Sequence, residues 1–225
     1  METEFKKNIV LAIESAIAGG SVCLLQDGRE IAHRVGDGGV SRAEELLGIV
    51  SEMLDSTGIQ KNSIGLVAVS NGPGSYTGIR IGIATAIGLK HALNIPVVGV
   101  DTLEAMAKWA SGLGPTLAAI SFGKNDAAWQ AFRSEGEHSV PSGIAVVTGV
   151  DEFVSNALGS EYEQVVVSPD LYEKLRVDAN FQQITHRDNI STVIPALAIG
   201  HAASISDNPP KPLYLRNADL PPYAV

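Results

Sequence analysis

A glycine-rich loop, Gly72–Gly78, joins a short apolar run to a long apolar segment. Glycines at such a junction let backbone N–H groups face an anion, and the dipole of a following helix favours negative charge. The loop lacks the Lys that follows the glycines of a P-loop, so it is not a Walker A motif. The alternative is that Pro73 and Gly74 only shape a tight turn, with Ser75 or Thr77 as the N-cap of the helix.

The pair Glu14-Ser15 follows the first apolar run of the chain, Ile9–Ile13. A carboxylate at the end of a strand could hold a metal-bound water or orient a nucleophilic water. The alternative is a solvated residue that caps the next turn. No second acid lies nearby in the sequence, so the spacing favours this alternative.

The residue spacing gives little support to a metal site or to a serine or cysteine nucleophile. No two of the five histidines stand four apart on a helix, and none pairs with Cys or an acid at a ligand spacing, which predicts no metal site. The Gly-x-Ser-x-Gly pattern of a nucleophile elbow is absent. The single cysteine, Cys23, lies within the apolar run Val22–Leu25. It is predicted to be a small buried hydrophobic residue, not a nucleophile.

The residue pattern in the first half of the chain predicts three strands, then a helix, a strand, a helix, a strand and a helix. The predicted strands are Ile9–Ile13, Ser21–Gln26, Arg29–Val35, Ile64–Val69 and Pro96–Val100, with a hairpin turn at Asp27-Gly28. The predicted helices are Ser41–Gly58, Tyr76–Leu93 and Asp101–Ser111, the first and third opened by capping boxes, Ser41 with Glu44 and Asp101 with Glu104.

The second half predicts a similar order of elements. Strands are expected at Thr116–Phe122, Ala128–Arg133, Ile144–Thr148, Gln164–Val167 and Phe181–Thr185, and helices at Glu152–Leu158, from Ser168-Pro169, and at Ile190–Ser204. Pro195 is expected to kink the last helix or to move its start.

This order predicts two α/β lobes, each a mixed sheet with flanking helices. The predicted divisions are 1–111 for the first lobe, 112–207 for the second lobe and 208–225 for an extended Pro-rich tail. In such a duplicated fold the ligand site is expected in the cleft between the lobes. The first hairpin of each lobe would supply a turn that grips phosphate, and helix N-termini would point into the cleft.

The predicted helix Tyr76–Leu93 is apolar nearly all round. A surface helix needs one apolar stripe, so this helix is expected to be covered on both sides, by its own sheet and by a partner subunit. Gly78, Gly82 and Ala86 recur at four-residue spacing and could let another helix come close. On this hypothesis a bulky residue at Gly82 abolishes association. The alternative is close packing on the chain's own sheet.

Composition narrows the class of protein. The chain has 225 residues and a formal net charge of −9, which argues against a nucleic-acid-binding surface spread over the whole protein. One cysteine, a charged N-terminus without an apolar core and the lack of a long uncharged apolar stretch predict a soluble cytoplasmic protein that does not enter the membrane.

The run Asn71–Gly82, the stretch Asn94–Val100 and the tail Pro212–Arg216 resemble the TsaB (YeaZ) family. The resemblance implies a two-lobed actin-like, sugar-kinase-like (ASKHA) fold. It also implies a dimer-forming, non-catalytic subunit that helps to install threonylcarbamoyl on adenosine 37 of tRNAs. The implied partners are a TsaD-like catalytic subunit, a TsaE-like ATPase and, when the chain is alone, a second copy of itself; tRNA would be met only through the complex.

The family pairs through the helices of its first lobe, so the resemblance also implies site residues. The expected interface residues are Leu46, Val50, Met53, Tyr76, Ile79, Arg80, Gly82, Ile83, Ala86, Ile87 and Lys90. The candidate nucleotide-binding residues are Glu14, Ser15, Gly72, Gly74 and Ser75, with no catalytic residue and no metal ligand. No cofactor is expected for this chain alone, and ATP with Mg²⁺ is expected only in the complex.

Three departures from the family pattern favour a scaffold over a catalyst. Glu14-Ser15-Ala16 stands where the family has Asp-Thr-Ser, and Ser41–Glu44 stands where it has a His-Ser-Glu-like start. The His-x-x-x-His metal pair of the catalytic relatives is absent. The alternative function is an ATP-dependent small-molecule kinase of the same fold; the histidine spacing gives a metallopeptidase little support.

Overall fold

A computed structural model describes nine stretches of the chain. They are residues 9–17, 19–36, 43–110, 114–136, 138–159, 162–177, 180–182, 190–203 and 209–215. The predicted capping box at Ser41 lies outside these residues.

The first lobe follows the predicted order of elements. It comprises β1 (Ile9–Glu14), β2 (Ser21–Gln26), β3 (Arg29–Val35), α1 (Ala43–Thr57), the short 3-10 helix η1 (Lys61–Ser63), β4 (Ile64–Gly72), α2 (Tyr76–Leu93), β5 (Val97–Asp101) and α3 (Thr102–Trp109). Its sheet has the order β3-β2-β1-β4-β5. The hairpin strands β1, β2 and β3 are antiparallel, and β1, β4 and β5 are parallel.

The second lobe repeats this pattern with one extra strand. It comprises β6 (Thr116–Phe122), β7 (Asp126–Glu135), β8 (His138–Pro141), β9 (Val146–Gly149), α4 (Val150–Gly159), β10 (Gln164–Val167), α5 (Pro169–Leu175), β11 (Ile190–Thr192) and α7 (Pro195–Ala203). The strand order is β11-β10-β6-β7-β8, and β9 pairs with β7 beside β8. The sequence analysis missed β8.

Local signals in the sequence explain several boundaries. Asp27 and Gly28 both have positive φ, 52° and 74°, as a two-residue hairpin turn requires. Helix α1 stops at Gly58, whose φ is 69°. Asp101 caps α3, because its carboxylate accepts a hydrogen bond from the N–H of Glu104 at 2.9 Å. The hairpin and the role of Asp101 as the N-cap of α3 are therefore confirmed.

At the end of the second lobe the predicted strand at Phe181 is wrong, and of the two alternatives for the final helix the one in which Pro195 moves its start is confirmed. Phe181 was expected in a strand but lies in a helical turn over residues 180–182, with its side chain buried in the second-lobe core. The final helix was expected from Ile190, but Ile190–Thr192 is β11 and α7 begins only at Pro195. Proline has no N–H to donate and its ring fixes φ, so the first helical position suits it and it sets the start of the helix.

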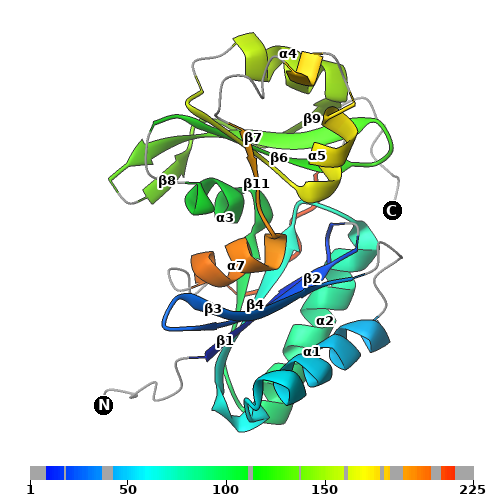
Figure 1. Ribbon diagram of the computed structural model, residues 1–225, viewed down its shortest axis with the longest axis vertical. Coiled ribbons are helices and arrows are strands. Elements are labelled where there is room, and N and C mark those ends of the chain that lie inside the picture. The colour runs from blue at the N-terminus through cyan, green and yellow to red at the C-terminus, as the bar shows by residue number, and fades with distance from the viewer. Residues whose placement is uncertain are drawn as a thin grey trace.

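The helices form layers around the two sheets (Figure 1). Helices α1 and α2 cover one face of the first sheet, and α7 covers its other face. Helix α3 lies beside α7 and contacts strands of both sheets, whereas α4 and α5 cover the far face of the second sheet. No helix in the described stretches is both long and apolar enough to cross a membrane.

The two lobes share a hydrophobic core where α3 and α7 meet the sheets. One cluster of buried side chains joins Ala12 of β1, Met106 of α3, Phe132 of β7 and Ile199 of α7. Helix α7 comes from the range 112–207 that was assigned to the second lobe, yet it packs on the first sheet. Its Gly200 permits this approach, because a Cβ there would lie 2.2 Å from the side chain of Leu25.

Candidate functional site

A small cavity lies between the two lobes. Its lining includes Glu14, Ser21 and Val35 of the first lobe, Pro169 and Asp170 of the second, and Pro195 at the start of α7. The volume is about 50 Å³, enough for a water molecule or a small ion. Pockets that enclose drug-sized ligands measure about 300–1,000 Å³, so the cavity has no room for a nucleotide.

Glu14 ends β1 and is the only candidate nucleotide-binding residue that lines this cavity among the described residues. Its side chain is fully buried. Oε1 accepts hydrogen bonds from the N–H groups of Ala16 at 2.5 Å and Ile17 at 3.1 Å, and from the hydroxyl of Ser70 at 3.1 Å. Oε2 is buried and has no hydrogen-bond partner within the described chain.

These contacts revise the sequence-based description of Glu14. The carboxyl group caps the turn after β1, as the alternative hypothesis held, but it is buried and not solvated. Burial raises the pKa of Glu14 to about 7, and the charge of Asp170 adds to the rise, whereas the hydrogen bonds of Oε1 oppose it. At neutral pH the carboxyl group is therefore partly protonated.

The glycine-rich loop after β4 uses its polar groups within the chain. The Ser75 hydroxyl accepts a hydrogen bond from the N–H of Gly78 at 3.2 Å and caps α2, as the turn hypothesis held. The N–H of Ser75 donates to the carbonyl of Ala16 at 2.6 Å, and that of Ile79 donates to the Ser75 carbonyl at 2.9 Å. These three N–H groups are therefore already hydrogen-bonded within the chain.

The remaining candidate residues of the cleft also serve internal packing. The Ser15 hydroxyl is buried and donates to the carbonyl of Gly78 at 2.7 Å. Gly72 and Gly74 flank a cis peptide bond to Pro73 and have φ of 114° and 153°. A Cβ on Gly74 would lie 2.5 Å from the Ala16 carbonyl oxygen, so this glycine lets two chain segments meet. The structure gathers these residues around one junction without turning them toward a ligand.

The first hairpin turn of the second lobe presents carbonyl groups to a lysine. The Lys174 ammonium of α5 donates to the carbonyl oxygens of Gly123 at 3.3 Å and Lys124 at 3.1 Å, and to the Ser121 hydroxyl at 2.5 Å. A phosphate-gripping turn would instead present N–H donors to the ligand. The expectation of such a turn in this lobe therefore finds no support in the geometry.

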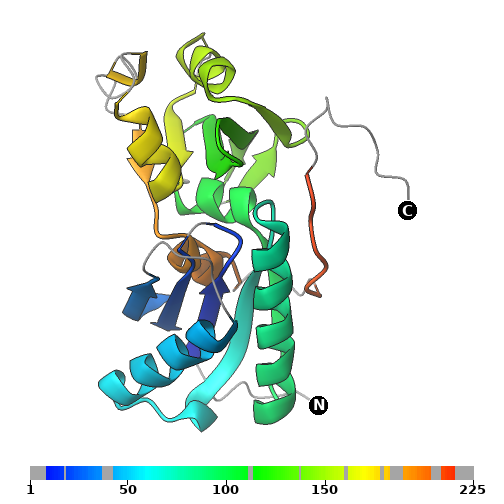
Figure 2. The ribbon, with the colours of Figure 1, turned by 90° about the vertical axis from the view of Figure 1, so that its right-hand side faces the viewer.

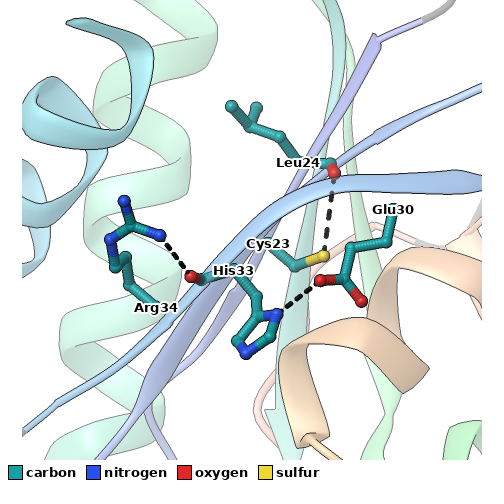
Figure 3. A network of polar contacts seen from close by, with 5 residues as sticks. All are labelled: Cys23, Leu24, Glu30, His33 and Arg34. Atoms are coloured by element: carbon teal, nitrogen blue, oxygen red, sulfur yellow. Dashed lines mark hydrogen bonds and ion pairs between the residues drawn. The ribbon is translucent and has the colours of Figure 1, made fainter. Parts of the chain in front are cut away.

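Cys23 is a structural residue (Figure 3). It is fully buried, and burial raises the pKa of its thiol to about 12, so the thiolate form is negligible at neutral pH. Its Sγ lies 3.8 Å from the carbonyl oxygen of Leu24. On the neighbouring strand β3, Glu30 and His33 form an exposed ion pair. The prediction of a buried small hydrophobic residue is confirmed.

Most of the expected interface residues lie inside the chain's own core. Helices α1 and α2 direct them against the first sheet. They are Leu46, Val50, Met53, Ile79, Gly82, Ile83 and Ala86. Gly82 shows the cause: a Cβ there would lie 2.3 Å from the Ser15 hydroxyl and 3.3 Å from Val69. In the chain alone these seven residues face their own sheet, which favours the alternative of close packing there, and a bulky residue at Gly82 would disturb the fold of the chain alone.

The other four expected residues lie on the outer face of α2. Tyr76, Arg80, Ile87 and Lys90 are exposed, with 53% of the Tyr76 surface and 39% of the Ile87 surface accessible. A Cβ on the nearby Gly88 would meet nothing within 4 Å. The glycine that could admit a second helix is thus Gly88, whereas the sequence analysis named Gly82, which faces the chain's own sheet.

Two exposed residues, Leu47 and Tyr214, were not among the candidates named from the sequence. Leu47 of α1 exposes 49% of its surface, although its neighbour Leu46 is buried. Tyr214, in the segment 209–215, packs its ring against Tyr76 with a centroid separation of 4.7 Å. The tail motif contained Tyr214, but nothing in the sequence indicated that the segment returns to α2.

Known proteins similar to this chain identify its family. A family model described as "TsaD: tRNA N6-adenosine threonylcarbamoyltransferase" matches residues 40–203, more than half of the chain. The tRNA threonylcarbamoyladenosine biosynthesis protein TsaB of Escherichia coli (strain K12) is 34% identical over 134 residues, which are 56% of this chain and 55% of that protein. The chain spans about half the length of the curated TsaB relatives it matches.

Solved structures identify the fold. YeaZ from Pseudomonas aeruginosa has a TM-score of 0.63 and 22% identity, covering 92% of this chain and all of that one. Component A of the Acidaminococcus fermentans (R)-2-hydroxyglutaryl-CoA dehydratase has a TM-score of 0.55 and 11% identity, covering 86% of this chain and 96% of that one. The predicted two-lobed ASKHA fold is confirmed. By the family model the chain belongs to the TsaD family, and its curated relatives named TsaB and the solved YeaZ structure support the TsaB (YeaZ) group within it.

Proposed function

We propose that this chain is the non-catalytic subunit of the complex that installs threonylcarbamoyl on adenosine 37 of tRNAs. In this role it binds and supports a TsaD-like catalytic subunit. The observation that carries the proposal is the outer face of α2, where aromatic, apolar and basic side chains are exposed beside the small residues Ala84 and Gly88. Small residues on an exposed helix face let a second helix pack closely.

Charge supports pairing through the first-lobe helices. Helix α2 contains no Asp or Glu, and its outer face carries Arg80 and Lys90. The adjacent α1 exposes the acids Glu52 and Asp55. A helix pair with one basic and one acidic member is complementary to a second such pair placed antiparallel to it. In the absence of the catalytic subunit, the same face would therefore pair two copies of this chain.

The proposal also includes the other members of the complex and its ligands. A TsaE-like ATPase joins the two subunits, and ATP with Mg²⁺ acts only in that assembly. The net charge of −9 supports a chain that meets tRNA through its partners and not directly. Such a complex would act in the cytoplasm.

The geometry of the cleft speaks against the alternative of a small-molecule kinase. A kinase of this fold needs space for ATP and a phosphate-binding turn in each lobe. The cavity of about 50 Å³ is too small, and Lys174 occupies the carbonyls of the second-lobe turn. Calorimetric titration of the chain with ATP and Mg²⁺ distinguishes the two functions, because the proposal expects no tight binding to the isolated chain.

The interface is tested by replacing Gly88 with Leu. The position is open in the chain alone, and Leu favours helix more than Gly, so the variant is expected to fold at least as stably. The bulky side chain keeps a second helix at a distance and is expected to weaken binding of the catalytic subunit by about tenfold or more, measured by calorimetry and size exclusion.

A matched control exists in the far lobe. Gly159 of α4 is also open to solvent, so Gly159→Leu tests the effect of the same substitution away from the proposed interface. Binding by the Gly159→Leu chain is expected to equal that of the wild type. Equal binding by a folded Gly88→Leu chain would show that the partner does not dock on α2.

A further inference from the structure

The segment 209–215, called the strap here, crosses the first lobe beside α2 (Figure 2). The Leu213 N–H donates to the carbonyl of Asn71 at 2.6 Å, which fixes the strap to the end of β4. A Cβ on Gly72 would lie 2.2 Å from the Leu213 carbonyl oxygen, and one on Gly99 would lie 2.6 Å from Cα of Pro210. The strap therefore lies directly against the backbone of β4 and β5.

The strap brings an aromatic ring to the outer face of α2. Tyr214 stacks on Tyr76 at 4.7 Å between ring centroids, and 41% of the Tyr214 surface stays exposed. The Arg80 guanidinium lies over the Tyr76 ring at 3.9 Å, and its Nε donates to the Tyr214 hydroxyl at 3.2 Å. Two rings from distant parts of the sequence thus hold one exposed arginine in place.

An arginine held in this way is prepared to bind an anionic group. A guanidinium has five N–H donors in a planar fork that matches a carboxylate, and the bond to Tyr214 uses one of them. Fixing the side chain in advance lowers the entropy that binding must spend. Aromatic and arginine side chains are also the types that most often dominate interface energetics.

The local charge indicates the kind of partner. Neither α2 nor the strap contains an Asp or Glu, and they carry Arg80, Lys90 and Lys211, although the whole chain has a net charge of −9. This positive region fits a protein surface that presents carboxylates. A polyanionic RNA would meet repulsion from the rest of the chain.

We propose that the strap and the outer face of α2 form one composite docking surface, on which Arg80, held between Tyr76 and Tyr214, binds a carboxylate of the TsaD-like catalytic subunit. The inference rests on the proposed function and extends it, because it places the strap inside the interface. The exposed Leu213, which precedes Tyr214 in the strap, offers an apolar contact on the same segment.

The test measures binding of full-length variants to the catalytic subunit by calorimetry at two salt concentrations. Tyr214→Ala is expected to weaken binding about tenfold or more, and Arg80→Gln is expected to do the same and to reduce the salt dependence. Tyr214→Phe keeps the stacked ring but loses the hydroxyl that holds Arg80, so a smaller loss is expected. Arg176→Gln removes an exposed arginine of the second lobe and is the matched control.

The outcomes separate this inference from the proposed function. If the wild type does not bind the catalytic subunit, the proposed function fails. If the wild type binds and Gly88→Leu weakens binding, but Tyr214→Ala and Arg80→Gln bind like Arg176→Gln, the function stands and the composite surface is refuted. The inference also fails if these two variants alter only self-association of the chain or only retention of tRNA.

Discussion

Replacing Glu14 by Gln tests whether a buried carboxyl group lowers the stability of the fold at neutral pH. Burial raises the pKa of Glu14 from 4.5 to about 7. At pH values between 4.5 and about 7, the Glu14 carboxyl group has lost its proton in the unfolded chain but still holds it in the folded chain. Because the unfolded state binds fewer protons there, the free energy of unfolding falls as pH rises through this window, and this contribution is constant above it.

The size of the effect follows from the pKa. A rise from 4.5 to about 7 corresponds to about 3 kcal/mol, at about 1.4 kcal/mol for each pH unit. Gln keeps the oxygen that accepts hydrogen bonds from Ala16, Ile17 and Ser70, and it carries no charge. Its NH₂ group replaces Oε2, which has no hydrogen-bond partner in the described chain, on the cavity that Asp170 also lines.

We therefore expect Glu14→Gln to unfold with a free energy up to about 3 kcal/mol higher than the wild type at pH 8, and with a nearly equal value at pH 4.5. Urea unfolding followed by circular dichroism at pH 4.5, 6 and 8 measures the difference. Burial also raises the pKa of Asp101, to about 6, but that residue is present in both chains and its contribution cancels. Glu52→Gln, on the exposed face of α1, is the control. A difference that stays constant with pH, or that grows as pH falls, would refute the reasoning.

Three further substitutions test the packing of the first lobe. Gly82→Leu is expected to lower the free energy of unfolding of the chain alone by about 1–3 kcal/mol, because it collides with Ser15; unchanged denaturation would contradict the inward placement of this glycine. Gly99→Ala is expected to push Pro210 and the strap away and to speed hydrogen exchange in residues 209–215 but not in α4; equal exchange would show that the strap is not held there. Ser75→Ala removes the N-cap of α2 and is expected to cost about 1 kcal/mol in chemical denaturation, whereas no loss would mean that water replaces the cap.

The order of elements was predictable because it depends on local signals. A continuous apolar run marked β1, and the dipeptide Asp27-Gly28, whose residues both have positive φ, marked the first hairpin. The wrongly predicted strand near Phe181 shows the limit of such signals. Phe181 and Ile184, three residues apart, fit a helical turn as well as a short strand, and Phe181 joins the buried cluster that contains Leu171 and Leu175.

The side of α2 that stays exposed could not be predicted, because both of its faces contain apolar or small residues. Gly82 and Gly88 look alike in sequence, yet the first faces Ser15 and the second faces open space. The properties of the cleft residues could not be predicted from the sequence either. The raised pKa of Glu14 is due mainly to burial, with a smaller contribution from Asp170, which the fold brings to the same cavity from the other lobe. The contact of Gly82 with Ser15 and the approach of Asp170 to Glu14 both join residues far apart in the sequence, so local residue spacing does not indicate them.

The two candidate sites together explain how a fold with a central cleft can act through its surface. In the cleft, the hydroxyl of Ser75, the ammonium of Lys174 and one oxygen of Glu14 all bond to the chain itself. Polar groups satisfied in this way stabilise the junction of the lobes but have little capacity left for a ligand. On the outer face of α2, by contrast, Arg80 and its two tyrosines are fixed and yet exposed. Preorganised side chains therefore lie where a second subunit can reach them, which favours a supporting subunit over a catalyst.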